Sequence, residues 1–447
     1  MSGAAGAAGS FGEFVARAHR AGRLVVQPRM GMSRPQDMRA GLVATKRAAA
    51  TTVGTITVDS YTRMGDHTAA RAAVAAKASL NGYPIATHDA DVTRAVLDGV
   101  AGPDFPVQVR HGSPSPESIF AALIEAGLHA TEGGPVSYCL PYSRAPLADS
   151  IRNWTRACEL LVQVRNTDAE PHLETFGGCM MGQLCPPSLL IALSVLECLF
   201  FRQHGIRSVS LSYAQQTSPD QDAEAVLALR RLAAEWLPDM DYHVVIYAYM
   251  GVYPRTPDGA LGLLAEAARL AVRTSASRLI VKTVSEAHRI PSVADNTNAL
   301  ETAAAVAAAE RRVLVPVPVQ DTGIYAEARA LMYAVLGLGE DIGRALRQAF
   351  QLGYLDIPYC LHPDNARQTR SYIDEAGRLL WSNTGAMPLH RIVRPTTRGE
   401  LTASGLLAAL SYVERKYDGI SIKDSAVSQI PAAEGGTDAA GELKGAY

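Results

Sequence analysis

The chain has 447 residues, with 42 Lys and Arg against 44 Asp and Glu, so its formal net charge is −2 at pH 7. This near balance of charge argues against nucleic acid or an anionic membrane as a partner. The apolar content of 48 % is ordinary for a chain with a large buried core, and the length suits either two or three domains or one α/β barrel.

The two ends of the chain are expected to be disordered. Residues 1–12 begin with a Gly/Ala/Ser run, and residues 425–447 are rich in Gly, Ala and acidic residues. The N-terminus lacks the basic region and apolar run of a signal peptide, and the six cysteines form no CxxC pair and no zinc-site spacing. We therefore expect a cytoplasmic protein without a bound metal.

Between these ends, short apolar or β-branched runs alternate with helical patterns. The predicted strands are Leu24–Gln27, Thr55–Val58, Tyr83–His88, Pro106–Val109, Leu128–Thr131, Ser208–Tyr213, His243–Tyr249 and Arg278–Thr283. Alternation of strand and helix predicts a parallel sheet, and eight strands suit a closed (β/α)8 TIM barrel. A doubly wound open sheet is the alternative, although no GxGxxG or GxxxxGK[ST] motif follows any of the strands.

A helical stretch follows the eighth predicted strand, and a segment of mixed pattern follows that. We expect residues 13–353 to form the barrel, which would be the catalytic domain, and residues 354–424 to form a C-terminal α/β extension. The most apolar stretch, Ser188–Phe201, carries Glu197 and is too short to span a membrane, so we expect a buried helix there.

Several chemically active side chains lie at or just after predicted strand ends. They are Arg29, Arg63, Arg110, Glu132, Tyr138, Tyr142, Lys282 and Glu286. In a (β/α)8 barrel the carboxyl ends of the strands converge on one mouth, where active sites lie, so these residues would meet around one cavity. Each alone has an ordinary explanation: a solvated loop arginine, a turn glutamate, tyrosine packing, or a surface Lys–Glu pair.

The charges predict the kind of ligand. Arginine binds carboxylates through two parallel hydrogen bonds and stays charged, so three arginines indicate an anion, most simply a dicarboxylate. Glu132 would then hold an ammonium group or move a proton. An acidic α-amino acid satisfies all four groups. A phosphorylated metabolite is the competing ligand, but phosphate sites depend more on glycine-rich loops and helix N-termini.

Several motifs in register make the chain similar to a known family. They are LVVQPRMG, TVDSYTR, SLNGYP, PVQVRHGSP, TEGGPVSYCLPY, LIVKTVSEAHRIP and LDIPY. The chain resembles the large (epsilon) subunit of adenosylcobalamin-dependent glutamate mutase, also called methylaspartate mutase. The resemblance implies a (β/α)8 barrel and an isomerase that interconverts (S)-glutamate and (2S,3S)-3-methylaspartate by a radical carbon-skeleton rearrangement.

The resemblance also implies roles for individual residues. The residues implied in substrate binding are Arg29, Arg63, Arg110, His111, Glu132, Tyr138 and Tyr142. Glu132 is the implied catalytic residue, which contacts the substrate amino group. The residues implied in contacts with adenosylcobalamin are Gly31, Asn81, Pro141, Tyr253, Lys282, Glu286 and Ile290. Tyr253 departs from the family pattern, which has phenylalanine there, and so adds a hydroxyl at the expected cofactor face.

A cobalt-ligating motif is absent from the sequence. Cobalamin-binding domains of this type carry Asp-x-His-x-x-Gly, and the nearest match, Asp241-Tyr242-His243, has Ile246 where glycine is required. The resemblance therefore implies a separate small cobalamin-binding (sigma) subunit that supplies the cobalt ligand. The implied assembly is a heterotetramer that contains a homodimer of this chain.

Three other functions stay open from the sequence. The first is a related cobalamin-dependent mutase acting on another dicarboxylate. The second is a cofactor-independent barrel lyase or isomerase with Glu132 and Lys282 as acid and base. The third is an inactive homologue that acts as a binding protein.

Overall fold

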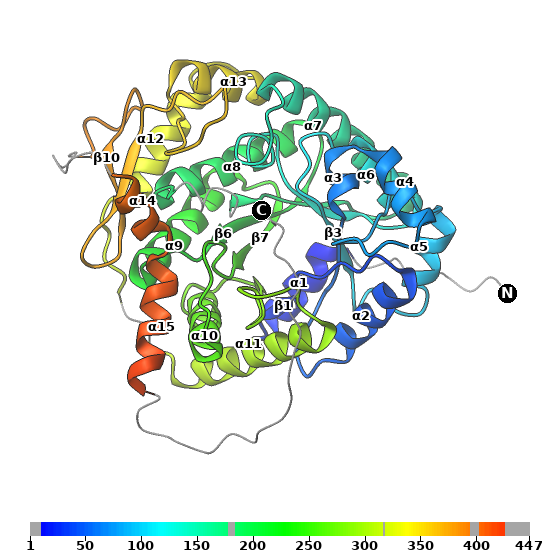
Figure 1. The fold of residues 1–447 in the computed structure, drawn as a ribbon. Helices are drawn as coiled ribbons and strands as arrows, with labels where there is room; N and C mark the ends of the chain where they lie inside the picture. Colours follow the sequence, from blue (N-terminus) through cyan, green and yellow to red (C-terminus); the bar gives the residue numbers. More distant parts are fainter. Residues whose placement is uncertain (1–9, 178–183, 316–317, 394–401, 425–447) are drawn as a thin grey trace.

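A computed structural model describes residues 10–177, 184–315, 318–393 and 402–424, and its centre is a barrel of parallel strands (Figure 1). The eight barrel strands of the described chain are β1 (Val25–Gln27), β2 (Gly54–Thr57), β3 (Val107–Arg110), β4 (Ala130–Glu132), β5 (His172–Glu174), β6 (Ser208–Ala214), β7 (Asp241–Tyr247) and β8 (Arg278–Ile280). From β2 to β8 each strand pairs in parallel with the next, and β8 pairs with β1. A parallel bridge between Val26 and Thr52 closes the ring, which confirms the predicted (β/α)8 barrel.

Helices form a ring around the barrel. Those between or following the strands are α2 (Pro35–Arg47), α3 (Ser60–Met64), α4 (His67–Ala75), α5 (Ala90–Leu97), α6 (Glu117–Glu125), α7 (Leu147–Val162) with the 3₁₀ turn η1 (Gln163–Thr167), α8 (Pro187–Gln203), α9 (Pro219–Trp236), α10 (Pro257–Arg273) and α11 (Val293–Val313). The predicted buried helix is α8, in which every residue from Pro187 to Phe201 is buried. Within the described ranges, no helix has both the length and the apolar character needed to cross a membrane.

The remaining elements lie outside this ring on one side of the molecule (Figure 1). They are α12 (Ile324–Leu336), α13 (Ile342–Leu352), the antiparallel pair β9 (Arg370–Ile373) and β10 (Leu379–Asn383), α14 (Ala403–Leu410) and α15 (Tyr412–Asp424). Helix α12 packs against α8 and α9, and α15 packs against α10.

One predicted strand is absent and one observed strand was not predicted, although the total of eight is right. Residues 83–88 form turns and not a strand: Tyr83 makes one bridge to Val58, and His88 N–H bonds to the carbonyl of Pro84. Pro84 has no N–H to donate, which disfavours a central strand there. The strand that was not predicted is β5. Only one of its three residues, Leu173, is apolar, so the sequence shows no apolar run there.

The prediction of a disordered segment over residues 1–12 is wrong at its end. Helix α1 (Phe11–Arg20) begins at Phe11, and Ser10 caps it: Ser10 Oγ accepts from Glu13 N–H at 3.1 Å and Glu13 Oε2 accepts from Ser10 N–H at 2.9 Å. Phe11 is 1 % exposed, and its ring stacks on His172 with centroids 5.0 Å apart. Because His172 begins β5, α1 closes the amino end of the barrel. Residues 1–9 and 425–447 lie outside the described residues.

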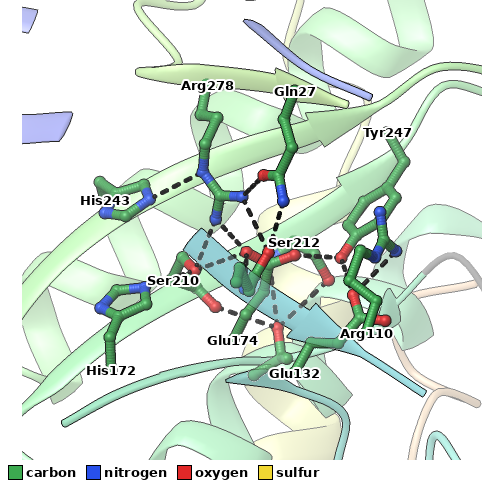
Figure 2. A network of polar contacts seen from close by, with 12 residues as sticks. Gln27, Arg110, Glu132, His172, Glu174, Ser210, Ser212, His243, Tyr247 and Arg278 are labelled. Carbon is green, nitrogen blue, oxygen red and sulfur yellow. Dashed lines mark hydrogen bonds and ion pairs between the residues drawn. The ribbon is translucent and has the colours of Figure 1, made fainter. Parts of the chain in front are cut away.

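The interior of the barrel is unusually polar. Barrel interiors are commonly filled by branched apolar side chains. Here the strands place fully buried polar and charged side chains inside, namely Gln27, Gln108, His172, Glu174, Ser210 and Arg278. Such groups are tolerated only when they are hydrogen-bonded, and these form one connected network (Figure 2).

Candidate active site

Arg110 and Glu132 lie side by side at the carboxyl ends of neighbouring strands. Arg110 ends β3 and Glu132 ends β4, and the parallel pairing of the two strands brings the side chains together (Figure 2). Arg110 Nη2 lies 2.8 Å from Glu132 Oε2, and the two side chains are 4 % and 3 % exposed. Burial alone would lower the pKa of Arg110, but Glu132 and nearby hydroxyls and carboxylates raise it overall, so the arginine stays charged.

The second terminal nitrogen of Arg110 is unused. Nη1 is buried and has no hydrogen-bond partner among the described residues. A buried charged donor without an acceptor is unfavourable, and such an atom in a barrel mouth marks a position where an anionic ligand would bind.

Tyr138 and His111 complete this group. Tyr138 donates its hydroxyl hydrogen to Glu132 Oε1 at 2.5 Å. Burial, and then the Glu132 charge, raise the pKa of Tyr138, so the phenol remains a donor. The His111 ring lies 5.1 Å from the Tyr138 ring and stacks on Trp154 at 5.8 Å. Burial lowers the pKa of His111 to about 3, so its imidazole is neutral at physiological pH.

Glu197 on α8 holds the loop that carries Tyr138 through two hydrogen bonds. Glu197 Oε1 accepts the backbone N–H groups of Val136 at 3.0 Å and of Ser137 at 2.9 Å. Gly133 begins this loop with φ of +122°, a conformation that L side chains rarely adopt. The Glu-Gly-Gly sequence therefore turns the chain sharply enough to point Tyr138 back at Glu132.

Of the two other predicted arginines, Arg63 lies beside Gly112, next to this group, and Arg29 lies close enough to Lys282 to act on its charge. Arg63 lies on α3, whose N-cap is Asp59, and its Cδ is 3.2 Å from the position that a β-carbon on Gly112 would occupy. Arg29 follows β1 and is half-buried. Within the described part of the chain, neither side chain makes a hydrogen bond or ion pair, so both guanidinium groups are available to a ligand.

A second group forms around Lys282, just after β8. Lys282 Nζ lies 3.5 Å from Glu286 Oε2 and 5.0 Å from the centre of the Tyr253 ring. Burial lowers the pKa of Lys282, and the charge of Arg29 lowers it further, while Glu286 acts in the opposite direction. The Tyr253 hydroxyl is buried and has no hydrogen-bond partner among the described residues.

The remaining predicted residues are more scattered. Asn81 Oδ1 accepts the backbone N–H of Ser60 at 3.0 Å, beside the helix that carries Arg63, and Gly31 packs against the backbone of Thr57. Pro141 is half-buried, and Tyr142 is 46 % exposed with its ring 6.2 Å from Tyr138. Ile290 is 69 % exposed.

The sequence reasoning missed three buried residues of the site. The Tyr247 hydroxyl lies within hydrogen-bond distance of Glu132 Oε2, at 3.1 Å, and of Glu174, and Glu174 is paired with Arg278. Glu174 lies in the undetected strand β5, and Tyr247 lies within an otherwise apolar strand. A signal was available for Arg278, which is a charged residue in a short strand that is otherwise apolar, whereas β5 gave no such contrast for Glu174. No set of three or more His, Cys, Asp or Glu side chains in the described ranges could hold a metal ion.

A (β/α)8 barrel with charged side chains gathered at the carboxyl ends of its strands is typical of an enzyme. A family model described as methylaspartate mutase E chain (MutE) matches residues 7–408, and the chain belongs to this family. A mutase is an isomerase, so the chain is an enzyme of the isomerase class.

Relatives with a curated name support the same conclusion. A glutamate mutase epsilon subunit of Halobacterium salinarum is 31 % identical over 387 residues, which cover 84 % of this chain and 80 % of that protein. One of Escherichia coli O157:H7 is 28 % identical over 389 residues, with 83 % and 80 % covered. One of Desulfitobacterium hafniense is 28 % identical over 365 residues, with 78 % and 75 % covered. Their names describe each of these relatives as one subunit of a larger enzyme.

Proposed function

We propose that this chain is the catalytic subunit of a glutamate mutase, which interconverts (S)-glutamate and (2S,3S)-3-methylaspartate. The two compounds are isomers, so the reaction needs no second substrate. The observation that carries this proposal is the buried pair of Arg110 and Glu132 with Arg110 Nη1 left unbonded. An α-amino acid brings a carboxylate for Nη1 and an ammonium group for Glu132, and so it satisfies both members of the pair.

The other arginines give the site its second anion-binding position. A substrate with two carboxylates places one on Arg110 and the other within reach of Arg63 and Arg29, whose guanidinium groups bond no other described residue. Fixed two-point contacts hold both ends of the carbon skeleton while it rearranges. Tyr138 and Tyr142 cover the site, and His111 contributes a neutral imidazole beside Glu132.

The residues around Lys282 suit a large polar cofactor at the mouth. The buried Tyr253 hydroxyl has no partner among the described residues, and Lys282 and Glu286 lie beside its ring, so hydrogen-bonding groups are present for a ligand that covers the mouth. We propose that Lys282, Glu286, Tyr253, Gly31, Asn81, Pro141 and Ile290 hold adenosylcobalamin. When bound, this cofactor supplies the carbon radical that the rearrangement requires.

A second protein completes the proposed enzyme. The sequence lacks the Asp-x-His-x-x-Gly motif, so the cobalt ligand comes from a small cobalamin-binding (sigma) subunit docked over the mouth. The proposed assembly contains two copies of each subunit. Within this chain, residues 13–353 would be the catalytic domain and residues 354–424 an extension.

The test combines the full chain with a cobalamin-binding subunit, adenosylcobalamin and (S)-glutamate under nitrogen, followed by proton NMR. We expect the methyl doublet of 3-methylaspartate, and no product when either protein or the cofactor is omitted. Product without cobalamin would instead establish a cofactor-independent isomerase. No product with glutamate, but turnover of another dicarboxylate, would reassign the substrate.

A further inference from the structure

A second buried carboxylate lies directly beside Glu132. Glu132 on β4 and Glu174 on β5 are register partners in the parallel sheet, and Glu174 is fully buried. Two neighbouring carboxylates in a buried site repel each other unless each has its own counter-ion. Here Arg110 neutralises Glu132, and Arg278 forms an ion pair with Glu174 on the amino-end side (Figure 2).

The Tyr247 hydroxyl joins the two carboxylates. It lies 3.1 Å from Glu132 Oε2 and is also hydrogen-bonded to Glu174 Oε1. A phenol has one hydrogen, so it donates to one carboxylate at a time. Burial, and then the charges of Glu174 and Glu132, raise the pKa of Tyr247, so this hydrogen stays in place at physiological pH.

Three donors other than Tyr247 reach Glu174, all of them at Oε2. Its Oε2 atom accepts from Ser210 Oγ at 2.9 Å and Gln108 Nε2 at 3.2 Å, and it also pairs with Arg278. Burial would raise the pKa of Glu174, but the charges of Arg278 and Arg110 outweigh burial and lower it, so the group is an anion. When the Tyr247 hydroxyl turns to Glu132, Glu174 keeps these three donors on Oε2 and gives up the bond to Oε1.

Substrate binding creates the need for this movement. In the free chain, Glu132 Oε2 is bound by Arg110 and Oε1 by Tyr138. A substrate carboxylate on Nη1 shares Arg110 with Glu132, so a second donor to Oε2 helps to keep the Glu132 carboxylate in place. Tyr247 already lies within hydrogen-bond distance of that atom. A carboxylate held between Tyr138 and Tyr247 keeps free lone pairs for an ammonium group.

Building on the proposed function, we infer that Tyr247, supported by Glu174 and Arg278, is a positioning residue that orients Glu132 to bind the substrate ammonium group. Tyr247 thus sets the preference of the site for amino dicarboxylates over plain dicarboxylates. A purely structural network would affect all ligands alike, because it would act on the barrel as a whole.

The test measures ligand affinity of the full chain by calorimetry, with (S)-glutamate and with glutarate, which has the same five carbons and two carboxylates but no ammonium group. We expect Tyr247→Phe to weaken glutamate binding by about tenfold, the usual effect of one hydrogen bond to a charged group, and to change glutarate binding by less than about twofold. In a Glu132→Gln background, Tyr247→Phe should have no further effect on the ratio of the two affinities.

Tyr213→Phe is the matched control. Tyr213 is also a fully buried strand tyrosine that donates to a carboxylate, Asp222 Oδ1 at 2.8 Å, but it belongs to a different cluster. It should leave both affinities unchanged.

An equal loss of both affinities in Tyr247→Phe, or no loss of either, would overturn the inference. Failure of the wild-type chain to prefer glutamate over glutarate would also overturn it. The NMR product assay decides separately whether the proposed function stands, because it needs no variant.

Discussion

The carboxyl group of Glu197 lies directly against Gly134: a β-carbon on Gly134 would fall 2.2 Å from the Glu197 carboxyl carbon. A buried acid on a helix thus occupies the space that a side chain in the active-site loop would need. Several measurable consequences follow from this and from the other contacts of the mouth.

Stability should depend on the protonation of Glu197. Burial raises the pKa of Glu197 to about 7, whereas two backbone N–H bonds act in the opposite direction. Because the folded pKa is raised above that of the unfolded chain, the stabilising contribution is fully present below about pH 4.5 and is lost as the pH rises through about 7. Glu197→Gln, which keeps an acceptor for both N–H groups, should remove on the order of 3 kcal/mol of this pH dependence.

Urea unfolding at pH 5 and pH 8 measures the effect. Asp222, whose pKa burial also raises to about 7, contributes in the same direction, so the difference between wild type and variant isolates Glu197. Parallel pH profiles for the two proteins would contradict this assignment.

Gly133→Ala should damage the site more than an ordinary glycine substitution. A β-carbon there would fall 2.4 Å from the Tyr138 ring and 2.6 Å from Trp154, and φ is +122°. We expect a loss of about 2–4 kcal/mol in the free energy of unfolding, and lost activity because Tyr138 is displaced. Gly127→Ala is the control, since φ is +80° and no heavy atom lies within 4 Å, so only backbone strain of about 1 kcal/mol applies. Equal losses in the two variants would exclude a steric effect on Tyr138.

Arg110→Lys should abolish most activity while the fold survives. Lysine keeps the charge but cannot bond Glu132 and a substrate carboxylate through two fixed nitrogens. We expect kcat/KM to fall at least about tenfold, because charge-assisted hydrogen bonds are lost. Circular dichroism and the NMR product assay measure the two properties. Turnover close to wild type would refute the two-point contact.

Tyr253→Phe should stabilise the free chain and weaken cofactor binding. The Tyr253 hydroxyl is buried without a described partner, and removing such a group relieves a desolvation penalty of about 1 kcal/mol or more. The midpoint of thermal unfolding should therefore rise in the absence of ligand. A cobalamin titration followed by visible absorbance would test the second effect. A lower midpoint would mean that the hydroxyl is already bonded in the free protein.

Phe11→Ala should destabilise the barrel from its amino end. Phe11 stacks on His172, and the Arg278 guanidinium carbon lies 4.9 Å from its ring centre. Truncating a buried phenylalanine typically costs about 3–5 kcal/mol. Phe11→Leu should recover part of that loss. A loss within error of zero in denaturant unfolding would show that α1 is not part of the cooperative unit.

The sequence was informative where a single strand carries its own signal. Seven of the strands have apolar or β-branched runs, and Arg110 and Glu132 could be found because each ends such a run. Strand β5 could not, because the burial of His172 and Glu174 depends on partners such as Ser210 and Arg278 that are distant in the sequence. Residues 83–88 gave the opposite error, since composition suggested a strand and Pro84 prevented one. The pairing of Glu132 with Glu174 follows only from strand register, which composition does not specify.

The closure of the amino end by α1 also affects how substrate and product enter and leave the barrel. With Phe11 packed at the start of β5, the described chain covers the amino end of the barrel, so we expect substrate and product to pass through the carboxyl end. A protein docked over the carboxyl end of the barrel would control both substrate binding and product release. Substrate entry and product release would then both depend on how often the two proteins separate.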